Sequence, residues 1–221
     1  MRRLIMLRHG QTDYNAGKRM QGQLDTQLSE TGVQQAHLAA DVVESLGVVK
    51  ILSSDLTRAK DTADIIAQRL GLDVVVDKRL RETHLGQWQG KTHGEVDRDF
   101  AGMRASWRHN PEWAPPGGES RVEVARRARP VVEELMRDFS GWDDNAVLIV
   151  AHGGTISAVT SHLLGLSVEQ YPMFSGLRNT NYSQLIARPK FTPGENATQF
   201  NAENVVDAQW YLDAWNQGLG G

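Results

Sequence analysis

The chain has 221 residues, enough for one large domain, and 40% of them are hydrophobic, which suffices for a sizeable core. The formal net charge of −3 gives the chain as a whole no electrostatic attraction to nucleic acid or to an anionic membrane. There is no cysteine, which excludes disulfides, cysteine-ligated zinc, iron–sulfur clusters and a thiol nucleophile, and fits a reducing compartment.

The N-terminal sequence begins like a secretory signal, with Arg2 and Arg3 in front of an apolar run. That run stops at Arg8, far short of the apolar core of a signal peptide. No stretch approaches the roughly 20 apolar residues needed to span a bilayer. The sequence therefore predicts a soluble, cytoplasmic protein.

The first half of the chain alternates predicted strands with predicted helices. Residues 3–8 form an apolar run typical of a buried strand. Apolar residues recur at helical spacing over 29–43, and again over 54–70, where Gly71 ends the pattern. Short apolar runs at 50–53 and 74–76 predict two further strands.

The second half begins with an irregular stretch and returns to alternation. Residues 84–118 are rich in glycine, proline and tryptophan, and we expect an excursion with short helices there. Ser120 and Glu123 have the spacing of a capping box, which opens a helix to about Phe139, kinked or interrupted at Pro130. The remaining expected elements are a strand at 147–151, a helix carrying Ile156, Val159 and Leu163, and strands near 183–187 and 208–212.

This order of elements predicts an α/β fold with a mostly parallel central sheet that helices cover on both faces. We expect one domain over residues 1–221, with the excursion at about 84–118 lying over the functional site. The last segment, 208–215, alternates weakly and suits an edge strand. An exposed edge can pair with a second copy of the chain, so a homodimer is one possible assembly.

Two of the apolar runs end in a histidine followed by glycine, at Arg8-His9-Gly10 and at His152-Gly153. Ligands of α/β proteins collect at the carboxyl ends of parallel strands, so both histidines are predicted to reach one site. A guanidinium can grip phosphate oxygens in a fork, and a neutral imidazole can attack phosphorus to form a phosphoramidate. A strand-ending turn without chemistry is the alternative for the first tripeptide taken alone.

Arg58 is predicted to lie in the first turn of a helix, where the macrodipole disfavours a cation. A phosphate bound at that helix end would compensate for it. The competing interpretation is a surface arginine paired with Asp55 or Asp61.

Glu82 begins a glycine- and tryptophan-containing segment that leads into the excursion. A carboxylic acid there could protonate a departing alkoxide. The sequence alone does not separate this role from that of a solvated glutamate beside Arg81, and His84 is equally compatible with a surface loop.

The order and placement of these motifs resemble the histidine phosphatase superfamily, the phosphoglycerate-mutase-like proteins. The resemblance covers almost the whole chain. It rests on Leu7–Thr12 with Asn15, Gln21–Gly22, Ser53–Ala59, Glu82 with Gly86 and Trp88, Pro116–Ser120, and Ala151–Gly154.

The resemblance implies a three-layer α/β/α fold without a metal ion or cofactor. It implies that His9 is phosphorylated during turnover and that Glu82 is the proton donor. Arg8, Arg58 and His152 would form the phosphate pocket. The residues expected to contact the substrate are Asn15, Gln21, Gly22 and Gly153.

Two departures favour a phosphatase over a mutase of this superfamily. The mutases usually have Gly-Asn after the second motif histidine, where this chain has Gly153-Gly154. They also carry a longer segment after the glutamate motif, whereas this chain soon reaches Pro115. We therefore expect a phosphomonoester hydrolase for a small phosphorylated metabolite, a sugar or glycerate ester. The alternatives are a cofactor-dependent phosphoglycerate mutase and a non-catalytic phosphate-binding regulatory module.

Trp107 and Trp113 of the excursion could stack on a sugar, but we expect them to cap the core. The arginines of the following helix alternate with glutamates, which is typical of a solvated helix face. These arginines are Arg121, Arg126, Arg127 and Arg129.

Overall fold

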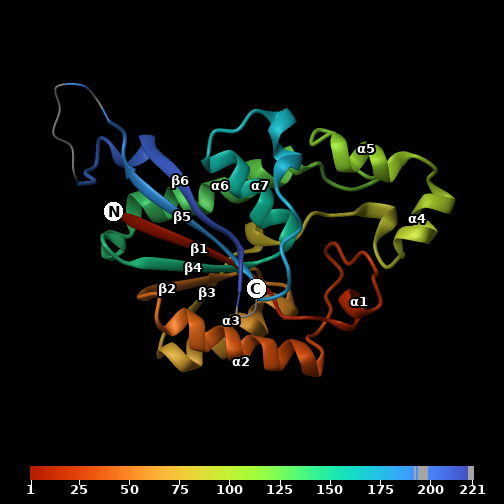
Figure 1. Ribbon diagram of the computed structural model, residues 1–221, viewed down its shortest axis with the longest axis horizontal. Coiled ribbons are helices and arrows are strands. Elements are labelled where there is room, and N and C mark those ends of the chain that lie inside the picture. Colours follow the sequence, from red (N-terminus) through yellow and green to blue (C-terminus); the bar gives the residue numbers. More distant parts are fainter. Residues whose placement is uncertain (192, 194–198, 219–221) are drawn as a thin grey trace.

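The computed structural model describes residues 1–191, 193 and 199–218. This part of the chain is built around a six-stranded sheet with the order β3-β2-β4-β1-β5-β6 (Figure 1). The strands are β1 (Arg2–Arg8), β2 (Val48–Ser53), β3 (Val74–Val76), β4 (Ala146–Ala151), β5 (Tyr182–Pro189) and β6 (Ala208–Gln217).

The sheet is mostly parallel, as expected. β1 pairs with β4, β4 with β2 and β2 with β3, all in parallel register. β5 runs antiparallel to both β1 and β6. β1 and β4 lie in the middle of the sheet and are almost entirely buried, so the residue that follows each strand is held rigidly.

Helices cover both faces and complete three layers (Figure 1). α2 and α3 lie on one face, and α6 and α7 on the other. Within the described residues, no helix combines the length and the apolar content that crossing a bilayer requires. The helices are α1 (Asp13–Ala16), α2 (Glu30–Glu44), α3 (Thr57–Leu70), α4 (His93–Asp99), α5 (Met103–His109), α6 (Arg121–Asp138) and α7 (Gly153–Leu163).

Each face of the sheet has its own hydrophobic core. One core packs Ile5 and Val150 of the sheet against small residues of α2 and α3 such as Ala40 and Ala63. The other packs the opposite sheet face, including Leu4, against α6 and α7. The alternation of side chains along a strand explains why neighbours in β1 belong to different cores.

α6 differs from its expected form at one point. The helix runs unbroken from Arg121 to Asp138 with Pro130 inside it, so of the two expected outcomes, a kink or an interruption, the interruption is wrong. Proline removes one helical hydrogen bond, but the residues around it are anchored on the core side. Ala128, Val131 and Val132 are all buried, and their packing against the core stabilises the helix on both sides of Pro130.

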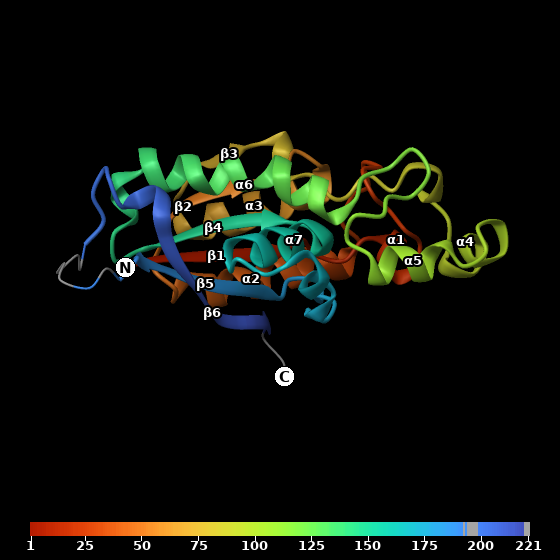
Figure 2. The same cartoon turned by 90° about the horizontal axis from the view of Figure 1, so that it is seen from above.

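The excursion after Glu82 carries α4 and α5 and lies beyond one end of the sheet (Figure 2). It has a small core of its own around the buried Trp88. The rings of Trp107 and Trp113 pack on Trp88, with centroids 6.0 and 5.5 Å away. Both tryptophans therefore cap a core, as expected, and this core fixes the excursion beside the carboxyl ends of β1 and β4.

Candidate active site

A cavity of about 380 Å³ opens where β1 and β2 end, and the excursion forms part of its wall. Leu85, His93 and Trp107 of the excursion line it. Most residues predicted for the site line it too, although they are far apart in sequence: Arg8, His9, Asn15, Gln21, Gly22, Arg58 and Glu82.

His9 follows β1 directly and is only 2% exposed. Its main-chain N–H donates to the carbonyl oxygen of Ala151 at 3.1 Å, which ties it to the end of β4. Its Nδ1 lies 2.6 Å from the carbonyl oxygen of Gly10, and since a carbonyl only accepts, Nδ1 carries the proton. The lone pair is therefore on Nε2, the nitrogen that would attack phosphorus.

The environment keeps the His9 ring neutral. Burial lowers the pKa of His9 well below its ordinary value, and the positive charges of Arg8 and Arg58 lower it further. Arg58 Nε lies 3.3 Å from His9 Nε2 and donates to it. A neutral imidazole with a directed lone pair is the form that nucleophilic catalysis needs.

Arg58 is 1% exposed, so the interpretation as a surface arginine paired with Asp55 or Asp61 is wrong. Its Nη1 and Nη2 donate to the carbonyl oxygens of Leu24 and Gly22 at 2.7 and 2.8 Å. Among the described residues, no carboxylate lies within 4.0 Å of this guanidinium, and burial lowers the pKa of Arg58 to about 10. A buried cation without a counter-ion is costly, and a bound anion would neutralise it.

Arg8 is the second arginine of the cavity. Its Nη1 donates to the carbonyl oxygen of Leu177 at 2.6 Å, whereas its Nε is buried and has no partner among the described residues. Burial lowers the pKa of Arg8, and the nearby Glu82 opposes this shift. Gly153, predicted to contact substrate, lies beside Arg8 in the wall of an adjoining cavity.

His152 does not line the cavity but packs against His9, with ring centroids 5.2 Å apart. It is fully buried, and its Nε2 lies 2.9 Å from the hydroxyl of Ser54. Its Nδ1 has no partner within the described residues. Burial lowers the pKa of His152 well below its ordinary value, and the charge of Arg58 lowers it further, so this ring is also neutral.

Glu82 also lines the cavity, and two main-chain N–H groups hold its carboxylate. Thr83 N donates to Oε1 at 2.7 Å, and Gly154 N, in the first turn of α7, donates to Oε2 at 3.1 Å. The neighbouring Arg81 is engaged elsewhere, in a two-bond ion pair with Asp55 at 2.6 and 2.7 Å. Glu82 is therefore half-buried at the cavity and does not pair with Arg81.

The three remaining predicted residues also lie at the cavity. Asn15 Oδ1 accepts from Thr12 N at 3.1 Å and closes a capping box at the start of α1. Gln21 is buried, and its amide oxygen accepts from the hydroxyls of Thr12 and Thr26. Gly22 belongs to the same loop and supplies a carbonyl oxygen to Arg58.

Comparison with known proteins identifies this arrangement. The family model described as "Histidine phosphatase superfamily (branch 1)" matches residues 4–196. The chain belongs to this superfamily. The match confirms the resemblance inferred from the motifs, the three-layer fold and the expectation of a phosphatase-type hydrolase.

Relatives in the superfamily include enzymes with assigned activities. The glucosyl-3-phosphoglycerate phosphatase of Mycolicibacterium vanbaalenii is 50% identical over 98% of this chain and 95% of its own. A structure of mycobacterial glucosyl-3-phosphoglycerate phosphatase with VO3 is 49% identical over 98% of this chain and 99% of its own, with a TM-score of 0.88. A probable phosphoglycerate mutase of Yersinia pestis is 37% identical over 75% of this chain and 76% of its own.

The site of this histidine phosphatase also contains residues that the motifs did not reveal. Arg127 was expected on a solvated helix face, but its side chain is 22% exposed and donates to main-chain oxygens next to Glu82, so that expectation is wrong for this residue. Its spacing from Val124 and Val131 places it at the border of the buried face of α6, a signal that could have found it. Ser54, beside His152, lies within the Ser53–Ala59 motif, but the motif assigned no role to its side chain.

The donor set of this superfamily member suits an anion better than a metal ion. Within the described residues, no group of three or more His, Asp or Glu side chains could hold a metal ion. The cavity wall instead gathers Arg8, Arg58, Lys18 and Arg19 around a single carboxylate, that of Glu82. Such a surplus of cations attracts a phosphate ester.

Proposed function

We propose that the protein hydrolyses glucosyl-3-phosphoglycerate, or a closely related phosphorylated sugar or glycerate, through a phosphohistidine on His9. One observation carries this proposal above all others. His9, which is neutral and buried with its lone pair on Nε2, lines the same cavity as Arg8 and Arg58. Neither arginine is paired with a carboxylate among the described residues.

In the first step, His9 Nε2 attacks phosphorus and forms a P–N bond. The bond between phosphorus and the bridging ester oxygen breaks, its electron pair moves to that oxygen, and Glu82 delivers a proton to it. In the second step, water attacks phosphorus and gives a proton to the Glu82 carboxylate. The P–N bond then breaks, its electron pair returns to Nε2, and inorganic phosphate leaves. The proton that Glu82 gives up in the first step is thus restored to it in the second.

Arg8, Arg58 and His152 would stabilise the charge that spreads over the phosphoryl oxygens. Arg8 has an unused, buried Nε for this purpose, and Asn15 adds a polar amide at the same wall. The Nδ1–H bond from His9 to the Gly10 carbonyl would stabilise the positive charge that the ring acquires on phosphorylation. Preorganised charges and dipoles of this kind are the main source of catalysis in phosphoryl transfer.

The choice of substrate rests on the relatives' names and on the adjoining cavity. This cavity, of about 650 Å³, shares Arg8 and Glu82 with the first and is also lined by Arg108 and Arg121. Neither of the latter two has a carboxylate within 4.0 Å among the described residues. A glycerate carboxylate would suit them, and the sugar would contact Gln21, Gly22 and Gly153.

The test compares kcat/KM for phosphate release in EDTA from glucosyl-3-phosphoglycerate, 3-phosphoglycerate and an aryl phosphate. We expect the glucosylated ester to exceed the others by about a hundredfold, equivalent to about 2.7 kcal/mol of contacts with the leaving group. Equal values would refute the assigned substrate. Isomerisation of 3-phosphoglycerate faster than its hydrolysis would point to a mutase, and no phosphate release at all would point to a binding module.

We further propose a cytoplasmic enzyme that acts on small metabolites rather than on nucleic acid or membranes, and that forms a homodimer. β6 is an edge strand of the described sheet and exposes Tyr211 and Leu212. Such an edge can pair with a second copy. Light scattering should give twice the chain mass, and a Leu212→Lys variant should shift the equilibrium toward monomer. A wild-type monomer at micromolar concentration would refute the dimer.

A further inference from the structure

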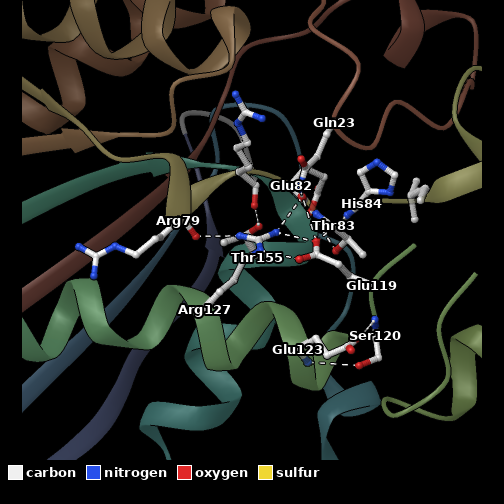
Figure 3. A network of polar contacts seen from close by, with 12 residues as sticks. Gln23, Arg79, Glu82, Thr83, His84, Glu119, Ser120, Glu123, Arg127 and Thr155 are labelled. Carbon is white, nitrogen blue, oxygen red and sulfur yellow. Dashed lines mark hydrogen bonds and ion pairs between the residues drawn. The ribbon is translucent and has the colours of Figure 1, made fainter. Parts of the chain in front are cut away.

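The segment that carries Glu82 is held by side chains rather than by a sheet or helix. Residues 81–85 lie outside the regular elements. Arg127 of α6 donates from Nη1 to the carbonyl oxygen of Arg79 at 2.7 Å and from Nη2 to that of Glu82 at 2.9 Å. Thr155 of α7 donates to the carbonyl oxygen of Arg81 at 2.7 Å (Figure 3). Side chains of α6 and α7 thus donate hydrogen bonds to three main-chain carbonyls at and near Glu82.

Arg127 is in turn aligned by Glu119, which precedes the N-cap residue of α6 (Figure 3). Arg127 Nε donates to Glu119 Oε1 at 2.8 Å, and Nη2 donates to Oε2 at 2.9 Å. Glu119 Oε2 also accepts from the main-chain N–H of His84 at 2.8 Å. The pKa of Glu119 is lowered because these donors outweigh the effect of burial, so the carboxylate is charged.

The carbonyl oxygen of Glu82 accepts a second hydrogen bond, from a residue of the loop that holds Arg58. Gln23 Nε2 donates to the carbonyl oxygen of Glu82 at 3.0 Å. Gln23 lies between Gly22 and Leu24, whose carbonyl oxygens hold Arg58. The backbone of Glu82 is therefore connected by one residue to the loop that fixes the phosphate-binding arginine.

We propose that Arg127, aligned by Glu119, is a positioning residue for the general acid, which sets where the Glu82 carboxyl group meets the leaving-group oxygen. This inference rests on the proposed role of Glu82 as proton donor. Arg127 touches no substrate in this account. It acts by fixing the main chain of Glu82, since a proton donor must be held within about 0.5 Å of its productive position.

The chemistry of the side chain explains why arginine stands here. The planar guanidinium donates to two carbonyls and both oxygens of one carboxylate at once. A lysine ammonium would keep the charge but not this geometry. Arg127→Lys is therefore expected to lower activity on the alkyl ester less than Arg127→Met, because the ion pair with Glu119 can persist, but it should not restore wild-type activity.

The experiment measures kcat/KM for an alkyl phosphate, which needs protonation of its leaving group, and for p-nitrophenyl phosphate, which does not. We expect Arg127→Met to lower the first value by about 30-fold or more and the second by less than about threefold. The ratio of the two values does not depend on the fraction of folded enzyme. Arg126→Met, on the exposed neighbouring position of the same helix, is the matched control and should change neither value.

The double variant Arg127→Met/Glu82→Gln shows whether Arg127 acts through Glu82. We expect it to match Glu82→Gln within about twofold on the alkyl ester, because positioning has no effect once the acid is gone. Equal losses on both esters in Arg127→Met, or a full further loss in the double variant, would overturn the positioning role alone. Equal losses on both esters in Glu82→Gln would instead overturn the acid itself.

Discussion

Replacing Gly154 by alanine tests how exactly the Glu82 carboxyl group must be placed. A Cβ at this position would lie 2.5 Å from Glu82 Oε1 and 2.8 Å from Thr83 Oγ1. Ordinary contact begins at about 3.4 Å, so the carboxyl oxygen must move by about 0.9 Å. Thr83 is buried and cannot give way easily, whereas Glu82 lines an open cavity. The displacement therefore falls on the proton donor.

A misplacement of about 1 Å costs on the order of a hundredfold in rate, and general acid catalysis contributes about 10²–10⁴-fold in total. We therefore expect Gly154→Ala to lower kcat/KM for an alkyl phosphate by about a hundredfold, or about 2.7 kcal/mol. An aryl phosphate with a good leaving group should lose less than about threefold. The close contact with Thr83 Oγ1 is also expected to cost some stability, so the decisive quantity is the ratio of the two kcat/KM values, which does not depend on the fraction of folded enzyme.

The assay pairs these kinetics with thermal unfolding, and Gly94→Ala is its matched control. Gly94 also lies in a helix, and a Cβ there meets nothing within 4 Å. It should leave both esters unaffected. Unchanged activity of Gly154→Ala on the alkyl ester would show that the position of the Glu82 carboxyl group is not critical, and an equal loss on both esters would show that Glu82 is not the group affected.

Three further predictions concern the protonation of His9 and His152, the partner of His152, and the need for a metal ion. Histidines of the unfolded chain take up protons near pH 6.5, whereas the pKa values of His9 and His152 are lower in the folded protein. The free energy of unfolding should therefore fall as the pH drops below 6.5, by up to about 1.4 kcal/mol per pH unit for each histidine. Urea unfolding at pH 7.5 and 5.5 measures this change in the free energy of unfolding. The His152→Gln variant should lose less stability than the wild type between these pH values, and a loss equal to that of the wild type would contradict the prediction. Ser54→Ala, which removes the partner of His152 Nε2, should lower kcat/KM about tenfold. Ser53→Ala should not, because among the described residues the Ser53 hydroxyl bonds only the Ser54 carbonyl. EDTA should leave kcat/KM unchanged; a loss restored by a divalent cation would argue against metal-free catalysis.

The sequence was sufficient to predict a mostly parallel sheet and most of the residues that line the cavity. An apolar strand followed at once by His9 can place the imidazole only at the strand's carboxyl end. The helical periodicity around Arg58 likewise placed it in the first turn of α3. These inferences succeed because hydrophobic periodicity and parallel topology together constrain where each chain segment ends.

What the sequence could not predict depends on partners that are distant along the chain. Whether Arg58 pairs with Asp55 or is buried was open, and the structure shows that Asp55 binds Arg81 instead. Arg127 and Arg126 are neighbours of the same type, yet one holds the Glu82 segment and the other is exposed. A helix face can be judged from spacing, but the loop that packs on it cannot. The unbroken α6 likewise reflects packing around Pro130 that outweighs a local preference.

The most direct test of the proposed phosphohistidine mechanism is to trap the covalent intermediate. Enzyme mixed with substrate labelled on phosphorus should be quenched in alkali within milliseconds and mapped by mass spectrometry. Nucleophilic attack by His9 should give an alkali-stable, acid-labile phosphoryl group on His9, which is absent in His9→Ala and accumulates in Glu82→Gln with an aryl phosphate. A label on His152, or full turnover in His9→Ala, would contradict it.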